Sequence, residues 1–170
     1  MDDLTYTYKI REGVKFSDGS DLTMDDVLYS LNRVREDAYG MSYLFEHVDS
    51  FEVDEKTRTL TVHLTQPDST WKYVPATTPC QILKKSVVEA EGDAYGTNEG
   101  SVVGTGPYKF VSWAADSQIV LEKNEYWWGG ADNLAIDKIN FYVMKDASTI
   151  ALAVKSGTIE FAPGITIDVL

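Results

Sequence analysis

Residues 102–130 read VVGTGPYKFVSWAADSQIVLEKNEYWWGG, and the rest of the chain can be placed around this stretch. Two glycines and Pro107 precede a β-rich run, which predicts a shaped turn that feeds a strand. Apolar and polar residues alternate from residue 108 to 113 and again from 119 to 123, with the polar insert 115–118 between them. This pattern predicts a β-hairpin closed by aromatic side chains, which indicates a structure and no function.

The alternation assigns Tyr108, Phe110 and Ser112 to one face of the first strand of this hairpin. Lys109, Val111 and Trp113 belong to the other face.

Motifs upstream and downstream of the hairpin extend the pattern over nearly the whole chain. The upstream motifs are YTYKIREGVKFSDG at 6–19 and LTMDDVLYSL at 22–31, and the downstream motifs are IDKI at 136–139, KDAST at 145–149 and KSGTIE at 155–160. Together and in this order, they resemble the large solute-binding proteins of bacterial ABC importers. This family includes the oligopeptide- and dipeptide-binding proteins. Several motifs in one order are more specific than any one of them.

The resemblance implies an α+β fold of the periplasmic-binding-protein type II class, with three subdomains, antiparallel or mixed sheets and covering helices. Residues 1–100 are expected to form the small subdomain inserted in the N-terminal lobe. Residues 101–170 are expected to return into the main N-terminal lobe, with a soft boundary. Members of the family are longer and begin with a secretory or lipoprotein signal, so the sequence resembles an internal piece.

The function implied by the resemblance is peptide transport. A monomeric, oligopeptide-binding receptor, periplasmic or lipid-anchored as a lipoprotein, would bind a short peptide and deliver it to the permease subunits of an ABC transporter for transmembrane transport. Nickel, a haem or an oligosaccharide remain alternative cargoes, because all occur among relatives. Tryptophans could stack on a sugar, although their places at strand ends favour core packing. They are Trp71, Trp113, Trp127 and Trp128.

Composition narrows the classes of partner. The chain has 27 acidic and 15 basic residues among 170 and a net charge of −12, so it would be repelled by nucleic acid and by anionic lipid. No apolar run has the length that spans a bilayer. Cys80 is the sole cysteine, which excludes an internal disulfide and a thiolate metal cluster and favours a small buried residue.

No catalytic or metal-binding motif is evident, so we expect no enzyme activity, no cofactor and no metal site. The motifs G-x-S-x-G, H-E-x-x-H and Walker A are absent. A hydrolase using Asp18, Asp25 or Asp26 would need two carboxylates in a dry pocket, whereas these residues are typical of a turn and a helix cap. The same acidic segment lacks the spacing of a calcium loop.

Local patterns predict further elements around the hairpin. Strands are expected at 4–10, at 51–64 as a second hairpin, at 139–143, and from Ile159 through Phe161. Helices are expected after the capping residues Thr23, Ser86 and Asp146, with a short helical segment from residue 71.

The resemblance also indicates where a ligand would be contacted. In the peptide-binding relatives, the region corresponding to residues 39–45 lies near the cleft, which makes Tyr39 and Tyr43 candidates; they could equally be packing tyrosines with solvated hydroxyls. Residues 78–85 resemble a stretch that crosses towards the cleft, which adds Thr78 and Gln81. The acidic partner of the peptide's amino terminus belongs to the C-terminal lobe of these relatives, so no residue here is assigned that role.

Overall fold

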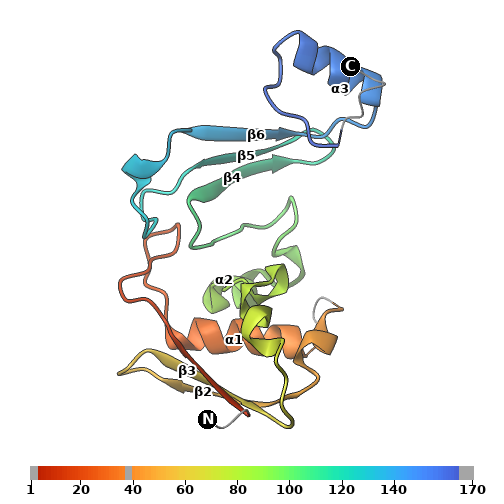
Figure 1. The fold of residues 1–170 in the computed structure, drawn as a ribbon. Coiled ribbons are helices and arrows are strands. Elements are labelled where there is room, and N and C mark those ends of the chain that lie inside the picture. The colour runs from red at the N-terminus through yellow and green to blue at the C-terminus, as the bar shows by residue number, and fades with distance from the viewer. Residues whose placement is uncertain (1–3, 37–39, 165–170) are drawn as a thin grey trace.

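A computed structural model describes residues 4–36 and 40–164 of the chain. It contains two three-stranded antiparallel sheets, and the helices α1 (Met24–Arg35) and α2 (Lys85–Glu91) lie between them (Figure 1). A third helix, α3 (Ala147–Lys155), lies beyond one end of the second sheet (Figure 1). These helices and antiparallel sheets confirm the expected α+β class.

The first sheet consists of β1 (Thr5–Lys9), β2 (Val48–Asp54) and β3 (Thr59–Leu64) in the order β1-β3-β2. The register pairs Tyr6 with Val62 and Tyr8 with Leu60. Since paired residues of antiparallel strands point to the same side, the apolar residues of all three strands share one face. Val62 is fully buried on that face, as the alternation in the sequence predicts.

Helix α1 provides much of the core beside the first sheet. Its apolar stripe, Val27, Leu31 and Val34, is buried at 3% exposure or less. Aromatic residues complete this core. The centroids of the Phe45 and Trp71 rings are 5.4 Å apart, and the rings meet edge to face. The core therefore joins the helix to segments far along the chain.

A buried carboxylate joins the starts of α1 and α2. Asp26 is 7% exposed, and its Oδ2 accepts hydrogen bonds from the backbone N–H and the hydroxyl of Thr23, which closes a capping box. Its Oδ1 accepts the backbone N–H of Lys85 at 2.9 Å. The predicted cap of α2 by Ser86 is wrong: the helix already begins at Lys85, so Ser86 lies inside the first turn.

The second sheet contains the predicted hairpin and one more strand. It consists of β4 (Tyr108–Ala114), β5 (Gln118–Lys123) and β6 (Lys138–Tyr142) in that order. An irregularity between Phe110 and Ser112 shifts the register, so that Phe110 pairs with Leu121 and Trp113 with Ile119. Phe110 and Trp113 consequently share a face. Simple alternation assigned them to opposite faces, and that assignment is wrong because a bulge inserts one residue.

Helix α3 begins as the sequence predicts, but the segment after it does not form the predicted strand. The carboxylate of Asp146 accepts the Thr149 N–H at 2.8 Å and caps the helix. Beyond the helix, the backbone N–H groups of Thr158 and Ile159 both donate to the Ala153 carbonyl. No strand is present between Lys155 and Gly164, because these amides are engaged by the helix end.

Five short 3-10 helices complete the described elements. They are η1 (Ser42–Phe45), η2 (Trp71–Ala76), η3 (Thr78–Cys80), η4 (Gly92–Ala94) and η5 (Ala131–Asn133). None of the helices in residues 4–36 and 40–164 combines the length and apolar character needed to cross a membrane.

Replacing the shared capping carboxylate, Asp26→Ala, should lower the free energy of unfolding by on the order of 2–4 kcal/mol, because it removes a buried carboxylate that accepts hydrogen bonds at two helix starts. The matched control is Asp25→Ala in the same turn, whose carboxylate is 61% exposed and pairs with Lys85. That change should cost less than about 1 kcal/mol. Urea unfolding followed by circular dichroism measures both; equal losses would contradict the prediction.

Candidate functional site

A hollow of about 330 Å³ brings together segments that are distant in the sequence. It is lined by Met41, Thr78, Pro79, Gln81 and Leu83. Met41 precedes η1, whereas the other four residues belong to η3 and to the extended segment that leads into α2. The hollow thus lies where the connection after α1 meets the connection before α2.

Local hydrogen bonds shape the part of the hollow around η3. The Thr77 hydroxyl donates to the Val74 carbonyl at 2.6 Å, and the Cys80 N–H donates to the Thr77 carbonyl at 3.1 Å. Cys80 is 6% exposed, and burial raises the pKa of its thiol. The cysteine is a neutral buried residue, as the sequence predicts, and holds the chain while Thr78 and Gln81 remain exposed.

The far side of the hollow is fixed to α1. The backbone N–H of Leu83 donates to Ser30 Oγ at 2.8 Å, and that hydroxyl donates to the Asp26 carbonyl at 2.6 Å. Ser30 is 1% exposed, so this link is shielded from water. The position of Leu83 is therefore tied to the same turn of α1 that carries the shared cap.

Met41 connects the hollow to an exposed tyrosine. The Tyr43 hydroxyl lies 3.6 Å from the Met41 sulfur, and the Tyr43 side chain is 65% exposed. Tyr43 lies beside the hollow and presents its ring to solvent.

The structure therefore gathers three of the four candidate contact residues at one place. Thr78 and Gln81 line the hollow, and Tyr43 contacts it through Met41. Tyr39 lies outside the described residues. The sequence analysis did not select Met41, Pro79 or Leu83 as contact residues. They could have been found from the fact that apolar residues flank each candidate in the sequence.

The chemistry of the hollow suits binding better than bond breaking. Its lining combines apolar surface with one hydroxyl and one amide, and it contains no ionisable side chain. Such a surface offers van der Waals contact and neutral hydrogen bonds. Among the residues that the structure describes, no group of three or more His, Cys, Asp or Glu side chains could hold a metal ion.

The acidic residues considered for a hydrolase have separate partners. Asp26 caps two helices, and Asp25 pairs with Lys85 at 2.8 Å. Asp18 accepts hydrogen bonds from Ser20 within its own turn and forms an ion pair with Lys84. These contacts distribute the three carboxylates over a turn and two helix starts.

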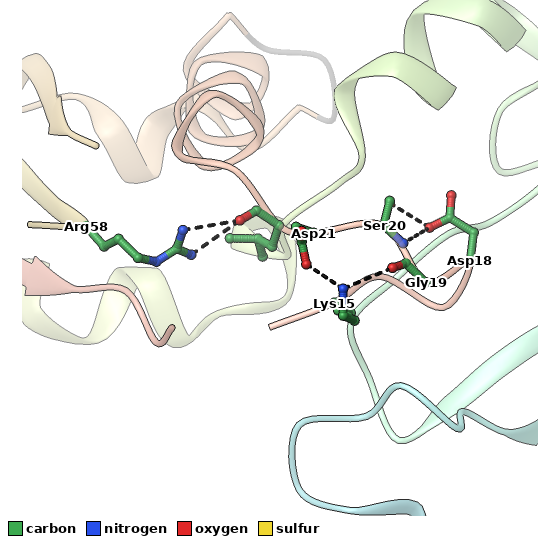
Figure 2. Close-up of polar contacts among 7 residues, drawn as sticks. Lys15, Asp18, Gly19, Ser20, Asp21 and Arg58 are labelled. Carbon is green, nitrogen blue, oxygen red and sulfur yellow. Dashed lines mark hydrogen bonds and ion pairs between the residues drawn. The ribbon is translucent and has the colours of Figure 1, made fainter. Parts of the chain in front are cut away.

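The turn that carries Asp18 is shaped by polar contacts (Figure 2). Lys15 Nζ pairs with Asp21 at 2.6 Å and donates to the Gly19 carbonyl at 3.3 Å, and the Arg58 guanidinium donates to the backbone carbonyl of residue 22. Burial alone would raise the pKa of Asp18, but the hydrogen bonds from Lys84 and Ser20 and the Lys84 charge lower it to about 2. The ion pair joins this turn to the residue next to Leu83 of the hollow.

The described residues combine two antiparallel sheets, interposed helices and a neutral hollow. Comparison with known proteins identifies the family. Residues 1–170 match the family "Bacterial extracellular solute-binding proteins, family 5 Middle", and the chain belongs to that family.

Individual relatives extend the comparison. The chain is 30% identical over 164 residues to the glutathione-binding protein GsiB of Escherichia coli strain K12. The alignment covers 95% of this chain and 31% of GsiB. The structure of Haemophilus influenzae OppA in complex with RPPGFSPFR has a TM-score of 0.78 and 25% identity, and the match covers 93% of this chain and 34% of that one. A nickel ABC transporter structure from Bacillus halodurans has a TM-score of 0.76 and 28% identity, and covers 92% and 30%. The chain thus spans about a third of the length of these relatives.

The Asp18 ion pair makes a pH-dependent prediction. Because the native pKa of about 2 lies below the ordinary 3.8, the charged carboxylate stabilises the fold above about pH 4, and this stabilisation is lost as the pH falls towards 2. The difference in unfolding free energy between the unmodified protein and Asp18→Asn should therefore shrink between pH 4 and 2. We expect a change below about 1 kcal/mol, since the Asp18 side chain is 36% exposed.

Urea unfolding across this pH range measures the difference. Lys84→Met serves as the second variant, because it removes the cation and should reduce the pH dependence contributed by Asp18. If the difference in unfolding free energy between the unmodified protein and Asp18→Asn stays constant from pH 5 to 2, the ion pair does not make stability depend on pH, and the prediction is wrong.

Proposed function

We propose that the protein is the solute-binding component of a bacterial ABC importer, which binds short peptides and delivers them to a permease. The observation that carries this proposal is the family match over all of residues 1–170, together with relatives named for glutathione and solved with a bound peptide. The neutral hollow supports it, because peptide side chains are held by apolar pockets with a few polar groups. Such a receptor has no catalytic step.

Within this proposal, residues 1–100 form the small subdomain inserted in the N-terminal lobe, and residues 101–170 belong to the main lobe. The separate sheets support the division, because β1, β2 and β3 lie in the first range and β4, β5 and β6 in the second. Each range thus has its own hydrogen-bonded framework.

The proposed ligand contacts are Thr78 and Gln81 in the hollow and Tyr43 beside it, with Tyr39 as a fourth. Met41 and Leu83 would receive an apolar side chain of the peptide. Gln81 and Thr78 would supply neutral hydrogen bonds from the exposed edge.

The proposed location of the protein is outside the cytoplasmic membrane, either in a periplasm or lipid-anchored at the outer face of the cell membrane. The receptor would act as a monomer that meets the transmembrane subunits of its transporter. The family's description as extracellular supports this placement.

A different cargo is the second candidate. The similarity to the nickel transporter structure favours nickel, and the family resemblance adds haem and oligosaccharide. The hollow contains no carboxylate, histidine or cysteine, so a metal would have to arrive as a chelate if it were bound here.

Native mass spectrometry of the protein purified without denaturation from the complete gene tests the function directly. A spread of masses that match short peptides would support a peptide receptor. One sharp mass of a sugar, a metal chelate or a haem would retain the binding role and overturn the peptide assignment.

Substitutions at the hollow test the contacts. Met41→Ala and Tyr43→Ala should each weaken peptide binding in the full-length protein by about five- to tenfold, because each removes contact surface from the ligand. The matched control is Tyr73→Ala: Tyr73 is also 65% exposed, but its ring contacts Lys72, whereas the Tyr43 hydroxyl contacts Met41 of the hollow. Isothermal titration calorimetry measures the affinities, and equal losses in the control and the test variants would refute the assignment of the hollow.

A further inference from the structure

Three turns that the sequence marks as distinct motifs meet in the structure. They are residues 16–19, residues 104–107 and residues 124–128, which we call the clasp. The first turn belongs to the core beside the first sheet, since Phe16 is fully buried there. The other two flank strands β4 and β5 of the second sheet. The clasp is therefore built from both halves of the chain.

Asn124 binds the two turns of the second half together. It is fully buried, its side-chain amide donates to the Gly106 carbonyl at 2.8 Å, and its backbone N–H donates to the Pro107 carbonyl at 2.9 Å. Its Oδ1 accepts the Tyr126 N–H at 3.0 Å. The side-chain amide and the backbone N–H of Asn124 would both lose their partners if the two turns separated, so separation is costly.

The turn at 16–19 joins this pair at two points. The Ser17 N–H donates to the Gly104 carbonyl at 2.9 Å. Gly19 has φ +84, and a Cβ placed on it would lie 3.0 Å from Cζ of the Tyr126 ring. Only glycine combines this backbone conformation with so close an approach of the ring.

A cation–π contact links the third turn of the clasp to Arg11, which lies outside the clasp. The Arg11 guanidinium lies over the Trp128 ring, 4.5 Å from its centroid. Trp128 is 51% exposed, so this contact contributes only modestly beside the Ser17–Gly104 hydrogen bond and the packing of Tyr126 on Gly19.

The clasp also reaches the hollow. Asp18, in the first turn, forms an ion pair with Lys84, and Lys84 follows Leu83 of the hollow directly in the chain. The ion pair therefore places the clasp next to the segment that forms one wall of the hollow.

We propose that the clasp holds the first sheet, its helices and the hollow in a fixed position relative to the second sheet, so that both halves move as one rigid body. Tyr126 and Gly19 are its positioning residues. This coupling between the two halves does not depend on which solute the protein binds.

Hydrogen–deuterium exchange with mass spectrometry tests the coupling in the full-length protein. Gly19→Ala should push the Tyr126 ring away and raise amide exchange in residues 124–128, where the N–H groups of Asn124, Tyr126 and Trp127 are hydrogen-bonded, by about tenfold, which corresponds to a modest loss of local stability. Tyr126→Ala should raise exchange at residues 16–19 in return. Exchange in β2 and β3 should stay unchanged, which separates a local effect from general unfolding.

Gly13→Ala is the matched control. Gly13 also has a positive φ, +70, but a Cβ there meets nothing within 4 Å. It therefore introduces similar backbone strain in the same loop and should leave residues 124–128 at their original exchange rates. The proposal is overturned if the control raises exchange at 124–128 as much as Gly19→Ala does, or if neither test variant affects the opposite side. Tyr126→Ala decides alone if Gly19→Ala fails to fold.

Discussion

The buried carboxylate of Asp26 is the constraint on which the arrangement around the first sheet depends. One oxygen closes the capping box of α1 and the other accepts the first N–H of α2, 59 residues further along the chain. The neighbouring Ser30 hydroxyl holds the Leu83 amide. An anion of this kind is costly to bury unless its hydrogen bonds are satisfied, so the two helix starts must meet here if the core is to close.

The hollow follows from that constraint. The segment between η2 and α2 has little regular structure of its own, and its course is set by its ends: Cys80 buried in the core, and Leu83 bonded to α1. Gln81, between them, is left exposed and lines the hollow together with Met41 from the other connection. The result is a neutral, partly apolar surface made from two connections, and for this reason we propose it as a place where a side chain of a ligand binds.

Much of the local structure could be predicted, because it depends on neighbours in the sequence. The cap by Thr23, the hairpin around residues 115–117 and the cap by Asp146 all follow from short-range patterns. The failures have local causes as well. A bulge put Phe110 and Trp113 on one face, and the end of α3 engaged the Thr158 and Ile159 amides that a strand would have needed.

The order of motifs along the chain determined the family and the α+β class, because both can be recognised from local sequence patterns without knowing which residues are in contact. Only the tertiary structure decided which motifs meet. Asp26 appears in the sequence as an ordinary cap, yet its second oxygen serves another helix. Gly19 appears as a turn glycine, yet a ring more than a hundred residues away fills the space beside it. Such contacts form because the packed core brings distant segments together. The spacing of residues along the sequence does not show which distant segments will be close in space.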